Sequence, residues 1–413
     1  MIKGNNNIVK NQSEEAIAEY TAKDGNDYLL MKATRSHSDS IRKLFKDAYG
    51  WNYGYPYVYT EDLGDKIEEA NQFWYVFIKK EENEVVGVGV LERKGFTLHG
   101  GRGIIKSGYR RLGLGTRFGS STLGHIMKMP PFRSLKRFNG GARAKVIAAH
   151  KYVEYAGATP YAIIPNRVIF GDKRGYALSN DYPFDEGRIE AVIQYAIYFN
   201  NFWKYRNKKI FLYPDKDISF HYNYALNNNR QMKNDTLTTT SEVSFKYDHY
   251  LFEVDPYNSF IIIKGYLNQK TLKDILAKYH KWNTIEWRIP ATQRGIYSQK
   301  LALEEGFIIA GYKLGALSFS QFDDVIKFCK FPNGIDDSQF EEVNFTPLGE
   351  KLFTKVKGSL PQKKRKKKAN WVLYCKECDY KEYRIRKSKV IKHPEQYTCP
   401  NCNNRLYSKK FEN

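Results

Sequence analysis

The chain has 413 residues, of which 42% are hydrophobic and 15% aromatic, so it is long enough for two or three domains with buried cores. Its formal net charge of +22 indicates a polyanionic partner, most simply nucleic acid; a solvated basic surface from Lys-rich residue usage is the alternative. No long apolar run and no apolar signal segment at the polar N-terminus occur, so neither a membrane span nor secretion is expected.

Regular elements alternate between helical and strand-like patterns over the first half of the chain. Residues 1–27 are predicted to be a polar lead-in, with one short helix possible over residues 13–23. The elements expected after it are a strand over 28–34, helices over 41–48 and 61–70, strands over 73–79, 85–91 and 96–105, a helix from Thr116, a strand over 144–149, a helix over 150–156, and strands over 158–164 and 190–198.

The segment Ile104–Thr116 reads IIKSGYRRLGLGT, which is a strand end, a turn rich in Gly and Arg, and the start of a helix. A helix N-terminus leaves backbone N–H groups unpaired and favours an anion. Gly113 and Gly115 let the backbone approach that anion closely, and the nearby arginines add positive charge. The segment therefore predicts a phosphate-binding strand–loop–helix. It is neither a Walker loop nor a dinucleotide fingerprint, because G-K-[ST] and G-x-G-x-x-G are both missing.

The spacing Arg110-x-x-Gly113-x-Gly115 after an apolar strand resembles the acyl-CoA pyrophosphate loop of the GNAT acyltransferase superfamily, whose pattern is Q/R-x-x-G-x-G/A. The order of the expected elements over residues 28–200 is similar to the same superfamily. The resemblance implies an α/β fold with a mixed sheet, and it implies acetyl-CoA or another acyl-CoA as cofactor. The cofactor-binding residues that it implies are Ile105, Ser107, Arg110, Arg111, Gly113, Leu114, Gly115 and Thr116.

Catalysis in this superfamily often uses a tyrosine general acid on the helix after the next strand. The resemblance thus implies Tyr155 or Tyr152, with Tyr155 preferred and core packing as the alternative for both. The general base is open: Glu92 and His99 could face the cleft from neighbouring strands. His150 is a third candidate, and a water chain could serve instead, because the strand before the loop carries no acidic residue.

Residues 240–335 are predicted to repeat the later part of this plan. The elements expected there are strands over 251–254 and 259–264, a helix over 271–279, a strand over 284–289, a helix over 298–305 and a strand over 307–312. The segment Tyr297–Phe307 resembles the end of a GNAT unit. No Q/R-x-x-G-x-G loop occurs in this part, so a degenerate copy that does not hold CoA is expected. A plain α/β domain of other ancestry is the alternative.

Two C-x-x-C pairs lie near the C-terminus, and their spacing matches a four-thiolate zinc ribbon. The expected ligands of a structural Zn²⁺ are Cys375, Cys378, Cys399 and Cys402. A redox role for one pair is the alternative, and His393 is a weaker candidate ligand. Paired cysteines of this kind favour a reducing compartment, so a cytoplasmic location is expected.

Six successive basic residues precede the ribbon and predict an exposed linker. Basic and aromatic residues within the ribbon favour nucleic-acid contact, while a nuclear-import signal, a solvated segment or protein docking through the ribbon are alternatives. The nucleic-acid-binding residues expected are Lys363, Lys364, Arg365, Lys366, Lys367, Lys368, Arg384 and Arg386.

Together these patterns predict a lead-in over 1–27, an acyl-CoA-binding GNAT-like domain over 28–205, a degenerate GNAT-like domain over 206–355, a basic linker over 356–370 and a zinc ribbon over 371–413. The function expected is an acyl-CoA-dependent N-acyltransferase that acts on, or is recruited to, nucleic acid. Two alternatives remain open. One is a non-enzymatic nucleic-acid-binding protein on a GNAT scaffold, and the other is a protein or small-molecule acyltransferase whose ribbon docks a partner.

Overall fold

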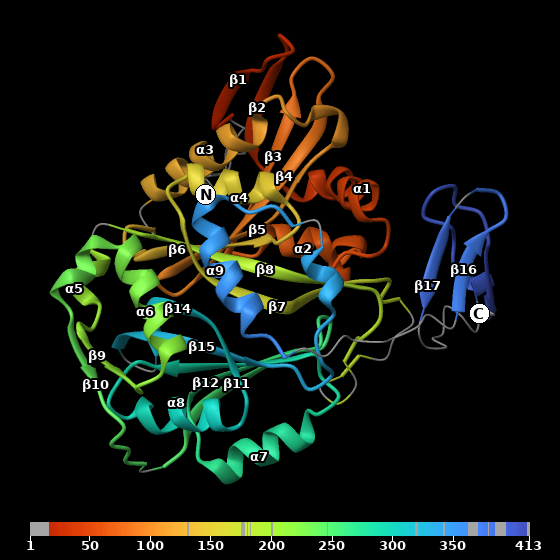
Figure 1. Ribbon diagram of the computed structural model, residues 1–413. Helices are drawn as coiled ribbons and strands as arrows, with labels where there is room; N and C mark the ends of the chain where they lie inside the picture. Colours follow the sequence, from red (N-terminus) through yellow and green to blue (C-terminus); the bar gives the residue numbers. More distant parts are fainter. Residues whose placement is uncertain are drawn as a thin grey trace, which may run out of the picture.

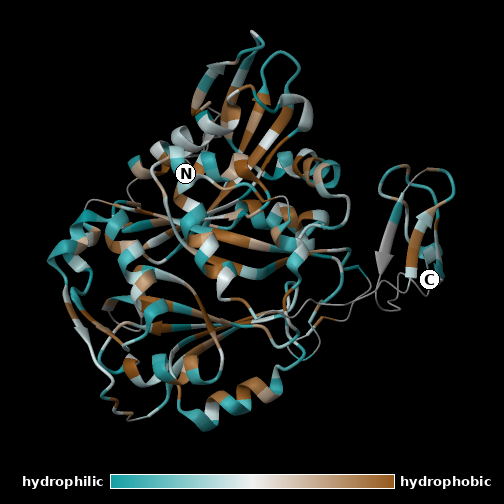
Figure 2. Ribbon diagram, in the orientation of Figure 1, coloured by the Kyte–Doolittle hydropathy of each residue, from teal (hydrophilic) through white to brown (hydrophobic). Residues whose placement is uncertain are grey.

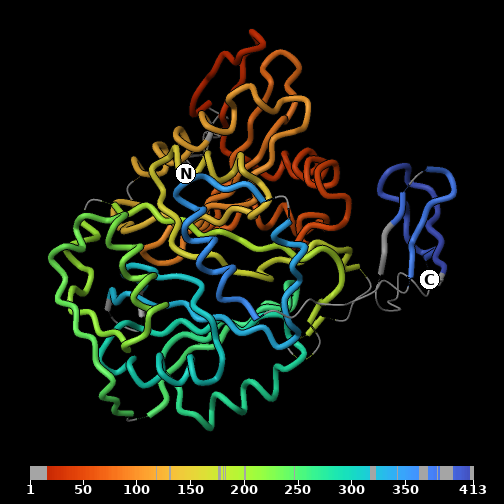
Figure 3. The backbone as a smooth tube through the Cα atoms, in the orientation of Figure 1, coloured from red at the N-terminus to blue at the C-terminus, as the bar shows by residue number. Residues whose placement is uncertain are grey.

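In the part of the chain that the structure describes, thirteen strands form one continuous mixed sheet, and a separate three-stranded sheet lies at the C-terminal end (Figure 1). The computed structural model describes residues 16–129, 132–174, 178–179, 181, 183–199, 201–245, 247–318, 321–341, 343–361, 371–378, 380–384 and 394–410. The backbone trace shows the two halves of the large sheet as consecutive stretches of chain, red to yellow and then green to blue (Figure 3).

The N-terminal half follows the predicted order of elements, with one additional strand at its start. Its strands are β1 (Ala18–Thr21), β2 (Asp27–Lys32), β3 (Gln72–Lys79), β4 (Glu84–Lys94), β5 (Thr97–Ile105), β6 (Arg137–Arg143), β7 (Thr159–Phe170) and β8 (Arg188–Tyr198). Its helices are α1 (Ser38–Tyr49), α2 (Asp62–Glu68), α3 (Leu114–Lys128) and α4 (Ile147–Tyr155). The order β-α-α-β-β-β-loop-α-β-α-β expected from the GNAT resemblance is therefore confirmed.

The C-terminal half contains several elements beyond those predicted. Its strands are β9 (Lys209–Leu212), β10 (Thr236–Thr239), β11 (His249–Asp255), β12 (Phe260–Tyr266), β13 (Thr284–Pro290), β14 (Ile308–Ser318) and β15 (Gln321–Lys330). Its helices are α5 (Phe202–Tyr205), α6 (Lys216–Asn228), α7 (Gln269–Lys278), α8 (Gly295–Glu304) and α9 (Pro347–Gly358). Of these, β9 and β10 pair with each other outside the large sheet.

The second half of the sheet repeats the first in strand order and direction. The strands lie in the order β4-β5-β6-β8-β7 in one half and β11-β12-β13-β15-β14 in the other. In both sets the second neighbouring pair is parallel and the others are antiparallel. Helices α7 and α8 occupy the same places in the chain order as α3 and α4. This correspondence favours a second, degenerate GNAT-like unit over an α/β domain of other ancestry.

The two halves join where β7 runs antiparallel to β14, with Gly311 opposite Ala162. A Cβ atom at Gly311 would lie 2.2 Å from the carbonyl oxygen of Tyr161 and 2.4 Å from Cβ of Ala162. No side chain fits into that space, so the close approach of the two strands requires glycine at this position.

Three predictions for the N-terminal half are wrong. Strand β1 replaces the short helix expected over 13–23, and it pairs with β2. The strand expected over 144–149 lies earlier, as β6, because pairing with β5 and β8 holds the glycine-rich segment RFNGGAR extended despite its low strand propensity. Residues 147–149 instead begin α4. Helix α3 begins at Leu114 and not at Thr116, because Gly113 takes a left-handed conformation (φ 86°) that starts the helix there.

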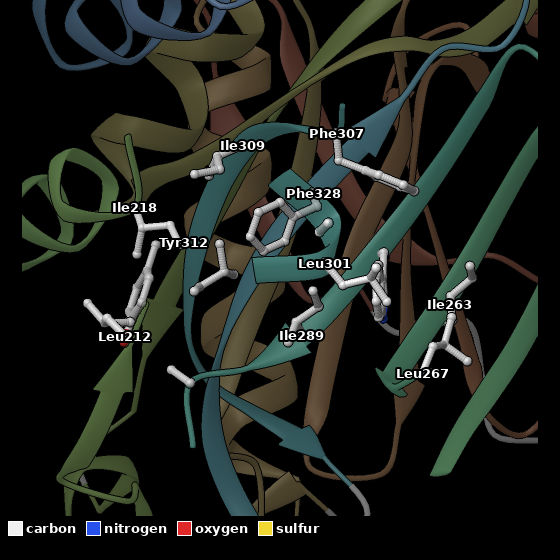
Figure 4. Close-up of a cluster of buried hydrophobic side chains, with 14 of the residues drawn as sticks. Leu212, Ile218, Ile263, Leu267, Ile289, Leu301, Phe307, Ile309, Tyr312 and Phe328 are labelled. Atoms are coloured by element: carbon white, nitrogen blue, oxygen red, sulfur yellow. The ribbon is translucent and has the colours of Figure 1, made fainter. Parts of the chain in front are cut away.

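The core of the second half lies on the side of the sheet that α6, α7 and α8 cover (Figure 4). Apolar strand residues such as Trp287, Tyr312 and Phe328 pack there against Leu272 and Leu301 of the helices. In Figure 2 the strands of this part contain brown stretches, and the helices beside them alternate between brown and teal. Since successive strand residues point to opposite faces, the residues between these core positions point to the other face of the sheet.

Candidate active site and metal centre

The predicted phosphate loop connects β5 to α3 through a short 3₁₀ turn over Ser107–Tyr109. Arg111 and Gly113 both have positive φ, 69° and 86°, which turns the chain sharply into the helix. No side chain that the structure describes caps the helix at Gly113, so its first N–H groups, on Leu114, Gly115 and Thr116, are left for another acceptor. A Cβ at Gly115 would meet no atom within 4 Å, so the space beside the helix start is open.

Positive charge surrounds this helix start. The side chains of Arg110, Arg111 and Arg117 are exposed. Arg110 Nε donates to the carbonyl oxygen of Ile105 at 3.1 Å, which holds this guanidinium next to the end of β5. Arg117 lies over the ring of Tyr20 at 4.8 Å, so strand β1 positions a second guanidinium. Unpaired N–H groups, the helix dipole and these cations together form a site suited to a pyrophosphate.

Strands β5 and β6 separate directly beside this loop. They pair only over Thr97–Gly100 and Arg137–Gly140, after which β5 continues to Ile105 without β6 as a neighbour. Beyond the paired stretch, β5 has a bulge against β4, where Arg102 has a φ of 54°, and this bulge changes the direction of the strand. A Cβ at Gly101 or Gly103 would meet nothing within 4 Å. The separated edge of β5 therefore offers backbone groups to an extended ligand that ends at the loop.

The two candidate tyrosines lie on α4 in different surroundings. Tyr155 is 75% exposed, whereas Tyr152 is half-buried and faces α3. A Cβ at Gly119 of α3 would lie 1.9 Å from the Tyr152 hydroxyl oxygen, so that hydroxyl sits directly against the helix that starts at the loop. Burial raises the pKa of Tyr152 to about 12, so its hydroxyl keeps its proton at neutral pH.

The two candidate bases are cross-strand neighbours, Glu92 on β4 opposite His99 on β5. Glu92 forms an ion pair with Lys94 at 3.0 Å and lies 3.9 Å from Arg102. Burial, then the charge of Lys313, holds the pKa of His99 well below its usual value, so its imidazole is neutral and is a weaker base than a free histidine. His150 is buried in α4, and its Nε2 is 2.9 Å from the carbonyl oxygen of Arg143, so it lies in a structural position.

A group of buried charges next to His99 was not predicted from the sequence. Its members, which we call the junction cluster, are Arg137 of β6, Glu286 and Arg288 of β13, Lys313 of β14 and Lys327 of β15. They come from both halves of the sheet, so only the tertiary structure brings them together. The one signal in the sequence is their place within apolar strands, as in Thr284–Pro290, which reads TIEWRIP.

The four predicted zinc ligands come together as expected, with their sulfur atoms all within 4.8 Å of one another. The Sγ–Sγ distances are 3.5 Å for Cys375–Cys402 and for Cys378–Cys399, and 3.6 Å for Cys378–Cys402. A tetrahedral Zn²⁺ with Zn–S bonds of about 2.3 Å needs sulfurs about 3.8 Å apart, so the thiols fit a zinc ion. Strands β16 (Trp371–Cys375), β17 (Lys381–Arg384) and β18 (Leu406–Lys410) carry this centre.

The expected nucleic-acid-binding residues lie largely outside the described residues. This holds for the basic run over 363–368 and for Arg386, as it does for His393, whereas Arg384 ends β17.

The ribbon touches the first half of the sheet near α1. Arg174 lies 4.3 Å from the ring of Trp51 and 5.2 Å from that of Tyr397, and Lys46 Nζ donates to Asn403 Oδ1 at 3.4 Å.

No protein-family model matches the sequence, and a search of curated protein sequences gives no match. Similar solved structures include GNAT acetyltransferases. A ribosomal-protein-S5-alanine acetyltransferase from Vibrio fischeri is 13% identical, with 45% of this chain and 98% of that chain covered and a TM-score of 0.35. A point mutant of the spermidine N-acetyltransferase SpeG from Vibrio cholerae is 14% identical, with 42% and 95% covered and a TM-score of 0.34.

A third similar structure is a GNAT superfamily phosphinothricin acetyltransferase from Sinorhizobium meliloti in complex with AcCoA. It is 11% identical, covers 44% of this chain and 90% of that chain, and has a TM-score of 0.34. Identity and TM-score are both low, so a function for this chain depends on its own site. Within the described part of the chain, no helix is long and apolar enough to cross a membrane.

Proposed function

We propose that this protein is an acyl-CoA-dependent N-acyltransferase whose active site lies in the N-terminal half of the sheet. The observation that carries the proposal is the uncapped helix start at Gly113, placed directly beside the separated edge of β5. The loop suits a pyrophosphate, and the strand edge suits the extended chain of an acyl-pantetheine. The second half has the same strand order but no such loop in its sequence, which supports a single cofactor site.

Each step of acyl transfer has a candidate group in this chain. A bound acyl-CoA would supply the thioester carbonyl carbon. The N–H groups of Leu114, Gly115 and Thr116 would hold the pyrophosphate, and a backbone N–H near Ile105 or Ser107 would stabilise the developing oxyanion. The neutral His99 would accept a proton from the acceptor's ammonium group so that the free amine can attack the carbonyl carbon, and Tyr152 would donate its proton to the leaving thiolate. Tyr152 replaces Tyr155 as the preferred acid because it faces α3, while Tyr155 is exposed.

Gly115→Glu is expected to abolish binding of acetyl-CoA, because the new carboxylate would lie where the pyrophosphate binds. The position has open space and no left-handed backbone, so the variant should fold, whereas Gly113 with its positive φ would be strained by any side chain. Gly124→Glu, on the same helix with equally open surroundings, is the matched control and should bind normally. Calorimetry with the full chain measures both. Undiminished binding by Gly115→Glu, or no heat with the unmodified chain, would contradict the proposal.

We further propose that the basic run over 363–368 and the ribbon recruit the enzyme to nucleic acid, in a reducing, cytoplasmic compartment. The net charge of +22 and the concentration of basic residues in this segment support this. An acyltransferase that acts on a protein or a small molecule, with a ribbon that docks a protein partner, is the second candidate. The four-thiol centre supports it equally, because such a ribbon also binds proteins.

Replacing Lys366, Lys367 and Lys368 by Gln is expected to lower the affinity of the full chain for a duplex oligonucleotide. If all three contact phosphates, the slope of log K against log salt should become shallower by about 2.7. The matched control replaces three exposed lysines of the α7 region, Lys270, Lys273 and Lys278, by Gln. Fluorescence anisotropy at salt concentrations from about 50 to 200 mM measures the affinity and the salt slope of both variants. Equal losses in the two variants would contradict recruitment through this run.

A further inference from the structure

The junction cluster carries more positive than negative charge, although it is buried. Four of its five members are cationic, and Glu286 is its only carboxylate. Glu286 accepts hydrogen bonds from Arg288 and from Lys327, the latter at 3.0 Å, through one oxygen atom. Its other oxygen, Oε2, has no hydrogen-bond partner among the described residues. Burying cations without counter-charges costs free energy, so the composition of this cluster needs an explanation.

Lys313 is the least compensated of the four cations. It is 8% exposed, and no carboxylate lies within ion-pair distance of it among the residues that the structure describes. The side-chain amide of Asn139 forms two hydrogen bonds in one orientation. In it, the amide nitrogen donates to the carbonyl oxygen of Phe138, and Oδ1 accepts from Lys313 Nζ at 3.0 Å. Burial and the charges of Arg137, Arg288 and Lys327 hold the pKa of Lys313 well below its usual value. A nearby anion would relieve this repulsion and favour the charged form of the amine.

A purely structural ion cluster in the same sheet looks different. Arg206 is equally buried, but it donates to two carboxylates, Asp235 and Asp324, at 2.7–2.8 Å. Asp324 in turn accepts from the hydroxyl of Tyr312 and from the backbone N–H of Gly315. Charge and hydrogen bonds are thus nearly saturated there.

The junction cluster is saturated only in part. Arg137 donates to Thr97 Oγ1 and to the carbonyl oxygens of Leu314 and Gly315, and Lys327 donates to Gln194 and Glu286. The Lys313 amine has no carboxylate partner among the described residues, and this points to a ligand at Lys313.

The position of the cluster relates it to the proposed active site. Arg288, Lys313 and Lys327 alternate with core residues on their strands, so they point away from the α7 and α8 side of the sheet. His99 and Arg137 similarly flank Leu98 and Phe138, which pack on the α3 side. Among the charged neighbours of His99, Lys313 lowers the pKa of its imidazole most. The cluster therefore lies on the same face as His99, next to the point where β5 and β6 separate.

We propose that the junction cluster binds an oxyanion, a phosphate or carboxylate group of the acceptor, and thereby positions the acceptor's amine at His99. This inference rests on the proposed function for the identity of the ligand as an acceptor. Arg288 and His99 are partly exposed, whereas Lys313 is buried, so an oxyanion would meet Arg288 and His99 first. The excess cations can form charge-assisted hydrogen bonds with the oxyanion. An acceptor without a negative group cannot form these bonds and should therefore bind more weakly.

A binding measurement tests the site without any turnover. In full-length Gly115→Glu protein, whose cofactor loop is filled by a carboxylate, inorganic phosphate should raise the thermal midpoint at constant ionic strength. Adding Lys313→Met should remove most of that rise. Adding Lys264→Met instead, which removes a partly exposed lysine paired with Glu253, should leave the rise intact. All of these variants keep the basic run over 363–368. Any phosphate that binds there therefore contributes equally to each rise in thermal midpoint and does not affect the comparison. An equal rise with and without Lys313 would overturn the proposal, and Arg288→Gln provides a second variant should Lys313→Met not fold.

Acetate in place of phosphate tells a carboxylate preference from a phosphate preference, and no stabilisation by either anion would also overturn the proposal.

With acetyl-CoA, the full chain should use O-phosphoethanolamine or glycine in preference to ethanolamine or methylamine. Lys313→Met should raise the KM for the preferred anionic acceptor about ten- to hundredfold, while the KM for the neutral amines changes little. Anion-dependent stabilisation that requires Lys313, without turnover of any amine, would support the site while contradicting the proposed enzyme activity. Turnover without anion preference would contradict the site alone.

Discussion

Removal of zinc is expected to unfold the C-terminal ribbon while the large sheet stays folded. Among the described residues, the buried hydrophobic side chains of the ribbon are Val372, Leu373, Leu406 and two of the cysteines themselves, a core too small to be stable alone. A structural zinc site of this kind contributes about 10–16 kcal/mol of folding free energy. The purified chain should therefore contain one zinc ion per molecule, and a strong chelator should make residues 371–410 sensitive to protease.

Cys402→Ser should have the same effect as the chelator, because it removes one of the four thiolates. Cys329→Ala is the matched control. This fifth cysteine is buried in β15, away from the ribbon, and its loss should leave the zinc content unchanged. Metal analysis with limited proteolysis measures the outcome. Acetyl-CoA binding should survive chelation, since the loop at Gly113 shares no residue with the ribbon. A metal-free chain with an intact, protease-resistant ribbon would refute the zinc assignment.

Arg206→Met is expected to destabilise the large sheet by about 3–5 kcal/mol. The arginine follows β8 and α5, at the end of the first half, and it holds Asp324 of β15 in the second half. Its removal leaves two carboxylates buried, with relative side-chain exposures of 1% for Asp235 and 0% for Asp324. The cost of an unpaired buried charge exceeds that of the lost contact itself.

Arg35→Met is the control for this variant, because Arg35 and its partner Asp65 are largely exposed. An exposed pair contributes at most about 1 kcal/mol, so the control should unfold close to the unmodified chain. Urea denaturation followed by circular dichroism compares the two variants. Similar midpoints for both would show that the Arg206 cluster contributes no more to stability than a surface ion pair.

Short-range patterns located the loop and the metal centre, although the helix after the loop starts two residues earlier than predicted. The helix start after Gly113 depends on a left-handed residue and on a helix that follows it, and both are visible in a dozen residues. The four cysteines also meet as predicted, because each C-x-x-C pair turns its two sulfurs together locally. Hydrophobic periodicity similarly located most strands and helices of both halves, including the order that matches the GNAT resemblance.

Long-range contacts decided what the sequence left open. The segment RFNGGAR becomes β6 only because β5 and β8 pair with it, a preference that no local propensity expresses. Tyr152 and Tyr155 share one short helix, and only packing against Gly119 of α3 distinguishes the inward residue from the exposed one. The junction cluster depends on more distant contacts still. Its charges lie up to 190 residues apart in sequence, from Arg137 to Lys327, and meet only because β7 pairs with β14.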